Sequence, residues 1–345
     1  MVPTRSYGRR SVETSREDKI LFPAAGLTKG ALIDYHERIA EHLLPHVRER
    51  ALVLRRFPDG IRAEGFYQKQ VGDHFPDWIA TVPVDVDTAT GKQELTVARG
   101  KATLAYLANQ ATVSLHPWLS RRDRLRHPDL LVVDIDPPGR AFEPARRAAL
   151  RVRDLFEELG VVSFPKLTGS RGVHVVAPLD RSDDFDAVRA FARAAMDFLA
   201  SRHDAELTTE QRKGRRGGRV YLDVARNAYG QTAVAPWSVR ARSGAPVAAP
   251  VAWEDLEHPG IGARDFTVKN VFRRIARRAD PWAGIRRRAR SLRAPRERLD
   301  RLRRRRAAAA PGAARTGLRA TRASTPLGSR PSPPPSPRRE TRGGR

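Results

Sequence analysis

The segment LLVVDIDPPG, residues 130–139, constrains the fold more than any other part of the sequence. Residues 130–133 are apolar without helical spacing, which predicts a buried strand, and the Pro-Pro pair ends it because proline cannot donate a ladder hydrogen bond. Side chains alternate along a strand, so Asp134 and Asp136 share one face about 7 Å apart. Two carboxylates held there repel each other and favour a divalent cation, although two solvated aspartates at a strand end are the plainer alternative.

The charge of the chain is concentrated at its C-terminal end. The 345 residues carry a net charge of +26. Residues 285–345 hold 20 arginines against three acidic residues, a net of +17, which leaves +9 for residues 1–284. This composition predicts a disordered basic tail at 285–345, a flexible arm at 1–14 and one folded domain at 15–284. A basic domain with an acidic pair inside it favours an anionic partner bound with a metal, and nucleic acid fits best.

Features that the sequence lacks exclude other classes of protein. It contains no cysteine, so disulfide frameworks and thiolate metal sites such as zinc fingers are excluded. The first residues, MVPTRSYGRR, carry charges with no apolar stretch behind them, so we expect neither a secretory signal nor a transmembrane helix. We therefore expect a cytoplasmic protein that has no membrane partner.

A helix is predicted after the segment KILFPAAGLTKG. Thr28 is a suitable N-cap, and apolar residues follow it at near-helical spacing. Lys19 and Lys29 flank the start of this helix, where unpaired backbone N–H groups favour anions, so the two lysines predict a phosphate site. Two solvated surface lysines explain the spacing equally well.

Two aromatic residues and a histidine precede the Asp134 strand. Phe66 and Tyr67 lie on a predicted strand after a Pro-Asp-Gly turn, and strand neighbours face opposite ways, so one ring faces away from the core. An exposed ring suits stacking on a nucleobase, whereas packing in the core is the commoner use. His116 lies near a strand end before a proline, where a lone histidine is more often structural than catalytic.

A glycine-containing turn precedes the apolar strand VHVVAPL. In TGSRGVH, residues 168–174, two glycines flank Ser170 and Arg171 and allow backbone N–H groups to converge on an anion. Thr168, Ser170, Arg171 and His174 can add donors, which predicts a triphosphate-binding loop without the Walker spacing. His174 also interrupts an apolar strand, where a buried imidazole needs a partner.

A third aspartate lies in the later predicted strand VYLDV. An unpaired carboxylate inside a strand is costly to bury, so a metal or another cation must compensate Asp223. Three aspartates are the number that a two-metal site requires, in which ions about 3.5–4 Å apart bind the attacking hydroxyl and the leaving phosphate oxygens. Asp134, Asp136 and Asp223 are therefore the candidate metal ligands.

Basic residues lie on both sides of this third aspartate in the sequence. Arg216 belongs to the basic, glycine-rich segment RKGRRGGR that enters the strand. Arg240 and Arg242 recur at period two in the segment WSVRAR, which predicts that they share one face of a strand. Such a face could contact a phosphate, or it could be an exposed basic strand.

With these segments in this order, the chain resembles the archaeo-eukaryotic primase superfamily. More narrowly, it resembles the polymerase domain of bacterial ATP-dependent DNA ligase D, which acts in nonhomologous end joining, or one of its stand-alone relatives. The blocks that carry the resemblance, between residues 18 and 282, are DKILFPAAGLTKG, GFYQK, LHPWLS, VVDIDPP, SRGVHVVAPL, GGRVYLDVARN and TAVAPWSVRAR. The resemblance implies an α+β (mixed α/β) fold with antiparallel or mixed central sheets flanked by helices.

The resemblance also implies a role for each candidate residue. Two divalent ions, preferably Mn²⁺ with Mg²⁺ as an alternative, would be held by the catalytic residues Asp134, Asp136 and Asp223. The nucleotide would be contacted by His116, Thr168, Ser170, Arg171, His174 and Arg240. DNA would be contacted by Lys19 and Lys29 at a 5′-phosphate, by Phe66 or Tyr67 at template bases, and by Arg216. Relatives often have lysine at the position of Arg171 and serine at that of Thr168, and the wider fork of arginine could shift nucleotide affinity.

The implied function is a DNA-repair nucleotidyltransferase of the EC 2.7.7 class. It would add nucleotides, preferably ribonucleotides, to a primer 3′-hydroxyl at gaps and double-strand breaks under template direction. The implied partners are nucleoside triphosphates and DNA ends or gaps that carry a 5′-phosphate, and the implied location is the nucleoid. Whether Ku and a separate DNA ligase are also partners is left open. Two alternatives remain, a primase-polymerase for chain initiation or damage bypass and a non-catalytic DNA-end-binding scaffold.

Overall fold

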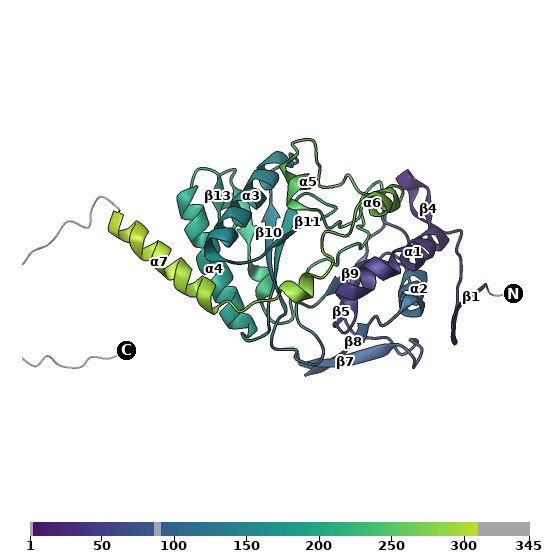
Figure 1. Ribbon diagram of the computed structural model, residues 1–345. Coiled ribbons are helices and arrows are strands. Elements are labelled where there is room, and N and C mark those ends of the chain that lie inside the picture. Colours follow the sequence, from purple (N-terminus) through teal and green to yellow (C-terminus); the bar gives the residue numbers. More distant parts are fainter. Residues whose placement is uncertain (1–2, 86–90, 310–345) are drawn as a thin grey trace, which may run out of the picture. The chain divides into compact units, whose positions relative to one another are not determined.

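The computed structural model describes residues 3–85 and 91–309 (Figure 1). The chain divides into two units, residues 1–303 and 304–345, and the sheets lie in the first of them. The described residues of this unit form two larger sheets with helices packed on them, as the mixed α/β expectation requires. In the described part of the chain, no helix is both long and apolar enough to cross a membrane.

The Asp134 strand lies at the centre of the C-terminal sheet. Leu131, Val133 and Ile135 alternate toward one face and pack with apolar residues of two helices, α3 (Glu143–Leu159) and α4 (Phe185–Arg202). Both helices therefore cover the same face of this sheet (Figure 1). All neighbouring strands are antiparallel except the last two. In spatial order the strands are β11 (Phe164–Leu167), β12 (Val173–Pro178), β10 (Leu130–Asp136), β14 (Val220–Asp223) and β13 (Leu207–Thr208).

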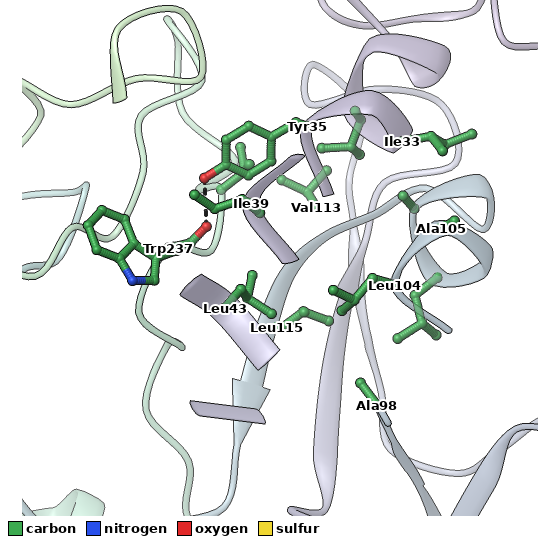
Figure 2. Packing of buried hydrophobic residues seen from close by; sticks show 14 of the residues in the cluster. Ile33, Tyr35, Ile39, Leu43, Ala98, Leu104, Ala105, Val113, Leu115 and Trp237 are labelled. Atoms are coloured by element: carbon green, nitrogen blue, oxygen red, sulfur yellow. Dashed lines mark hydrogen bonds between the residues drawn. The ribbon is translucent and has the colours of Figure 1, made fainter. Parts of the chain in front are cut away.

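The N-terminal sheet packs against two helices, α1 (Lys29–Val47) and α2 (Lys101–Asn109). Figure 2 shows the apolar cluster that joins them, and there the Tyr35 hydroxyl donates to the backbone oxygen of Trp237 at 2.7 Å. This bond ties the segment around Trp237 to α1. The strands are β6 (Phe66–Gln68), β5 (Leu52–Arg56), β8 (Lys92–Val97) and β7 (Ala80–Asp85), with β9 (Thr112–Pro117) paired to β5.

Helix ends follow the capping signals of the sequence. The Thr28 side chain accepts a hydrogen bond from the backbone N–H of Ala31 at 3.1 Å, so Thr28 is the N-cap of α1, as predicted. Gly160 ends α3 with a left-handed backbone, φ 74°, that disfavours a side chain. The remaining short elements are β3 (Ile20–Phe22), β4 (Leu27–Thr28), α5 (Trp253–Glu257), α6 (Val271–Arg277) and the 3-10 turns Pro23–Ala25, Lys213–Arg215 and Ala225–Asn227.

The predicted N-terminal arm contains a hairpin, β1 (Thr4–Tyr7) and β2 (Arg10–Glu13). Arg5 of this hairpin forms ion pairs with three carboxylates, at 2.6 Å from Glu17, 2.5 Å from Asp34 and 3.0 Å from Glu37. The expectation of a loose segment was wrong for residues 4–13, because polar composition does not reveal partners that lie farther along the chain.

Regular structure also continues past residue 284, the expected end of the domain. A 3-10 turn (Ile285–Arg288) precedes helix α7 (Arg293–Ala309), where Leu299 is buried and Arg296 pairs with Asp183 at 2.9 Å. The start of the predicted tail at residue 285 was therefore wrong, because scattered apolar residues such as Leu299 anchor an otherwise basic segment. The rest of that tail, residues 310–345, lies outside the described residues.

The predicted strand with Arg240 and Arg242 on one face does not form. Val239 makes only an isolated bridge to Val247, and Arg242 N–H donates to the Arg240 oxygen at 2.7 Å. This bond spans two residues and closes a tight turn, so the backbone cannot continue a ladder. The alternation of two arginines therefore misled the sequence interpretation.

Candidate active site

Four polar side chains form a row across the C-terminal sheet. Asp134 of β10 lies opposite His174 of β12 on one side and Asp223 of β14 on the other. His174 in turn lies opposite Lys166 of β11. Directly opposite residues of antiparallel strands project to the same face with Cβ atoms about 4.5–5.5 Å apart. We refer to Lys166, His174, Asp134 and Asp223 as the polar row, and Asp136 projects to the same face two residues farther along β10.

Within the polar row, Asp134 is buried and has a nitrogen-bearing side chain on each side. His174 Nε2 lies 3.3 Å from Asp134 Oδ1, and Arg226 Nε lies 3.4 Å from Oδ2. Burial opposes ionisation of Asp134, but His174 and Arg226 outweigh it and hold the pKa of the carboxyl below its ordinary value. The partner that the sequence required for a buried His174 is therefore Asp134.

Asp136 has the opposite electrostatic environment. Burial raises the pKa of Asp136, and repulsion from Asp134 and Asp223 raises it further. Arg171, whose Nη2 lies 4.0 Å from Asp136 Oδ1, and Arg216 both lower the pKa, but they do not cancel the upward shift. Asp223 Oδ1 accepts a hydrogen bond from the backbone N–H of Ala225 at 2.7 Å. The three carboxylates thus lack a cation that would balance all of them.

A divalent cation fits the chemistry of these carboxylates. Within residues 3–85 and 91–309, no three histidine or acidic side chains converge closely enough to hold a metal as they stand. The strand register nevertheless brings Asp134, Asp136 and Asp223 to one face, and carboxylate oxygens are the ligands that Mg²⁺ and Mn²⁺ prefer. The raised pKa of Asp136 shows that added positive charge would be favourable there. The donor set therefore fits a metal after rotation of the side chains.

The predicted phosphate loop packs closely on the end of β10. A Cβ atom on Gly172 would lie 1.9 Å from the Ile135 oxygen, so only glycine allows this approach. The Thr168 hydroxyl donates to the Gly172 oxygen at 2.9 Å, which closes the loop on itself. Arg240 Nη1 donates to the Thr168 oxygen at 2.8 Å, and Arg264 Nε donates to the Ser170 oxygen at 2.7 Å. Thr168 therefore shapes the loop, and Arg264 is a residue that the sequence interpretation missed.

The aromatic residues of β6 point to opposite faces of the N-terminal sheet. The Tyr67 ring lies 5.7 Å from the ring of His116, edge on, and the Arg55 guanidinium lies 4.5 Å above it. The Phe66 ring lies instead beside Arg56, at 5.4 Å. Both rings are about half exposed, so neither serves as a core residue. Burial lowers the pKa of His116, and nearby cations including Arg240 lower it further. Because Tyr67 contacts His116 and Phe66 does not, Tyr67 is the ring that shares a face with the predicted nucleotide contacts.

Lys19 and Lys29 are brought together by the short β3–β4 ladder. The Lys29 backbone N–H donates to the Lys19 oxygen at 2.8 Å, directly before α1. Lys29 is buried, its Nζ lies 3.3 Å from Ser15 Oγ, and the pKa of its ammonium is lowered by burial and then by Arg16. We call Arg16, Lys19 and Lys29 the α1 cation cluster. Arg16 was missed because it has no periodic relation to the lysines.

Two arginines flank the polar row, and a lysine belongs to it. The Arg216 guanidinium stacks over the Tyr221 ring at 3.8 Å, and its Nε donates to the Glu210 oxygen at 3.0 Å. Arg226 reaches Asp134 because a 3-10 turn follows Asp223 directly. Lys166 is almost fully buried and donates to the Val234 oxygen. Neither Arg226 nor Lys166 carried a motif, since Arg226 joins the site through a 3-10 turn and Lys166 through strand pairing.

The class of protein that this fold and site define is the primase-polymerase domain. The family described as LigD, primase-polymerase domain, matches residues 28–282 of the chain. The chain therefore belongs to the LigD primase-polymerase domain family, which confirms the family that the sequence resemblance implied.

Curated relatives agree with this assignment. The multifunctional non-homologous end joining DNA repair protein LigD of Mycobacterium tuberculosis is 31% identical over 299 residues, which cover 80% of this chain and 37% of the relative. The bifunctional non-homologous end joining protein LigD of Bacillus subtilis is 31% identical over 268 residues, covering 77% and 42%. The chain thus spans about two fifths of the length of these relatives.

A solved structure confirms the predicted fold class. The polymerase domain of Mycobacterium tuberculosis ligase D, in complex with DNA, matches with a TM-score of 0.74 at 30% sequence identity. The match covers 81% of this chain and 99% of that chain. The mixed sheets and their helices are therefore those of a LigD polymerase domain.

Proposed function

We propose that this protein is a template-directed nucleotidyltransferase that extends a primer 3′-hydroxyl at gaps and double-strand breaks in nonhomologous end joining. The observation that carries the proposal is the pairing of β10 with β14, which gathers Asp134 and Asp223 of the polar row and the neighbouring Asp136 on one face. Membership of the LigD primase-polymerase family supports the same reaction. The names of the relatives supply the repair pathway.

The three aspartates would hold two divalent ions, preferably Mn²⁺, which supply Lewis-acid chemistry to the attacking hydroxyl and the departing pyrophosphate. His174 and Arg226 keep Asp134 ionised, so that its carboxylate is available as a ligand at neutral pH. Arg171, beside Asp136, and Arg240, which donates to the Thr168 oxygen, would neutralise phosphate charge.

The remaining candidate contacts divide between nucleotide and DNA. His116 and Tyr67 share one face and provide flat surfaces for the nucleotide and a template base, while Phe66 faces the other side and would stack on a more distant base. Ser170 and His174 would contact the nucleotide. Arg216, which stacks on Tyr221 near Asp136, would contact DNA. We also propose that the protein prefers ribonucleotides, and this rests on its family alone.

The α1 cation cluster favours repair over chain initiation. A gap or break presents a downstream 5′-phosphate, whereas an initiation site has none. Arg16, Lys19 and Lys29 gather positive charge at the start of α1, which favours a phosphate there. A nucleoid location and cooperation with Ku and a DNA ligase follow as parts of the same proposal.

One assay tests the proposed reaction. Nucleotide addition is measured with Mn²⁺ on a gapped duplex with and without a downstream 5′-phosphate, and with ribo- or deoxyribonucleotides. We expect addition that depends on the template base and is stimulated by the 5′-phosphate. Addition that is indifferent to the phosphate would favour the primase-polymerase alternative, and DNA binding without any addition would favour the scaffold.

A further inference from the structure

A large cavity lies beside the polar row and is not used by the proposed reaction. Its volume is about 1070 Å³, and Lys166, Val132 and Val176 of the C-terminal sheet line it together with the C-terminal half of α1. Residues 280, 282–287 and 289 form another wall. None of the three aspartates and none of residues 168–174 lines it. The cavity is therefore separate from the predicted nucleotide site and shares only Lys166 with the polar row.

Positive charge gathers on the cavity wall around His46. Lys166, Arg50, Arg121 and Arg286 all line the cavity. Burial lowers the pKa of His46 to about 3, and these four cations contribute to the shift. The imidazole is consequently neutral at physiological pH, and it adds no charge to the four basic side chains.

The acidic residues of the lining do not balance these cations. Asp129 lies 2.7 Å from both Arg50 and Arg121 and can neutralise one of them. The other three acidic residues have other partners: Glu41 pairs with Lys101, Asp180 accepts from Ser182, and Asp280 accepts from the backbone N–H of Trp282. Arg48, Arg181 and Arg287 also line the cavity, so seven basic side chains face four carboxylates. Burial lowers the pKa of one of the seven, Lys166, to about 7. The lining keeps an excess of positive charge that a bound anion would offset.

Two buried donors on this wall have no partner. Arg50 Nε and Arg121 Nη2 are fully buried, and neither has a hydrogen-bond partner among the described residues. A buried donor left unsatisfied costs about 1–3 kcal/mol, so such groups in a folded protein call for a ligand, an ion or ordered water. Both residues line the cavity, but these two nitrogens are covered by protein atoms, so an anion inside it would accept from them only after the side chains rotate.

The size and aromatic lining of the cavity indicate more than an inorganic ion. Trp118 and Trp282 line it, and the Trp282 ring lies 5.8 Å from Lys166 Nζ. Drug-sized ligands occupy pockets of about 300–1,000 Å³ that combine apolar walls with a few charged groups. We propose that this cavity binds a small phosphorylated organic molecule of nucleotide size, with its phosphate among Lys166, Arg50, Arg121 and Arg286.

The test is calorimetric binding to the full chain in EDTA, which removes metal-dependent nucleotide binding. The probes are AMP, adenosine and inorganic phosphate. We expect one AMP per chain with a Kd below about 1 mM, weaker binding of phosphate, and none of adenosine. Absence of saturable AMP binding would overturn the proposal, as would adenosine binding equal to AMP. If inorganic phosphate binds as tightly as AMP, the proposal that the ligand is an organic molecule is overturned.

Variants locate the binding. Arg286→Gln, at an exposed position, and Lys166→Met, which replaces a buried ammonium with an apolar group of similar length, should each weaken AMP binding about tenfold or more. Arg288→Gln is the matched control, since Arg288 is a neighbouring arginine that does not line the cavity. Asp134→Asn and Arg240→Gln test the predicted nucleotide site and should leave metal-free AMP binding unchanged. Loss in Arg240→Gln with full binding in both cavity variants would contradict the proposal.

Discussion

The polar row and the α1 cation cluster are built in opposite ways. The row gathers acidic side chains through the register of adjacent strands, and the other face of their sheet packs on two helices. The cluster gathers Arg16 and Lys19 from the loop between β2 and β3 and Lys29 from the first turn of α1. Strand pairing fixes the first region, whereas the second depends on side-chain interactions between segments.

The two regions also differ in how their charges are compensated. In the polar row, repulsion among the carboxylates is left in place and raises the pKa of Asp136. In the cluster, the nearby Glu17 carboxylate is bound by Arg5 and accepts from Thr14, so it is less able to neutralise Lys29. One region is thus suited to cations and the other to an anion, for which Lys19 exchanges its ion pair with Asp59 at 2.8 Å. If so, changes in one should alter chemistry and changes in the other should alter recognition of the DNA end.

The largest effect is expected in the polar row. Asp134→Asn keeps the shape of the side chain but removes its charge, so nucleotide addition should fall by at least about 100-fold, as when other groups that stabilise charge in a transition state are lost. DNA affinity should be unchanged, which fluorescence anisotropy with the gapped duplex would measure. Asp186→Asn, on the surface of α4, is the control. Full activity in Asp134→Asn would remove the catalytic assignment.

The cation cluster should give a smaller and more selective loss. Hydrogen bonds to charged groups are worth about 1.5–3 kcal/mol, so Lys19→Ala combined with Lys29→Ala should reduce stimulation by the 5′-phosphate by about tenfold or more. Addition on the gap without the phosphate should stay unchanged. Lys92→Ala, at an exposed lysine of β8, controls for general loss of charge. Equal losses with and without the phosphate would assign the lysines to general DNA binding.

These two regions also differ in how far the sequence predicted them. The alternation in LLVVDID predicted that Asp134 and Asp136 share a face, and the strand is as expected. The VYLDV and VHVVAPL strands were expected as well. Strand pattern does not say which strands are neighbours, however. That Asp134 lies between His174 and Asp223 therefore required the structure.

The sequence predicted less of the surroundings of both regions. Arg226 and Lys166 reach the polar row through a 3-10 turn and a paired strand, neither of which leaves a periodic signal. Arg5 contacts carboxylates 12 to 32 positions away, so its hairpin was taken for a flexible arm. Contacts between distant segments decide these features, and local propensity does not report them.

A substitution at Arg5 tests whether the ion pair with Glu17 keeps the α1 cation cluster positively charged. Arg5→Met should release the Glu17 carboxylate toward Lys29 and reduce stimulation by the 5′-phosphate by up to about fivefold, the range of one partly exposed ion pair. The rate without the phosphate should not change. Arg10→Met, in the same hairpin, is the matched control. Identical stimulation in Arg5→Met and the wild type would show that Glu17 does not influence the cluster.

The cluster should also respond to pH. Burial and the neighbouring Arg16 lower the pKa of Lys29 from 10.5, so Lys29 is charged at low pH and loses its proton earlier than an ordinary lysine as pH rises. Stimulation by the 5′-phosphate should therefore fall by about threefold toward alkaline pH, because only the deprotonated fraction is affected. Lys29→Arg stays charged and should show a flatter profile. Parallel profiles for both proteins would contradict the assignment.

The smallest expected effect compares the helix starts of the two regions. Thr28 caps α1 beside Lys29, and Asp184 caps α4, accepting from the backbone N–H of Ala187 at 2.8 Å. Thr28→Ala and Asp184→Ala should each lower the free energy of unfolding in urea by about 1 kcal/mol. Only Thr28→Ala should also reduce stimulation by the 5′-phosphate, because fraying of the first turn of α1 displaces Lys29. If both variants reduce it equally, the cluster depends on global stability rather than on the start of α1.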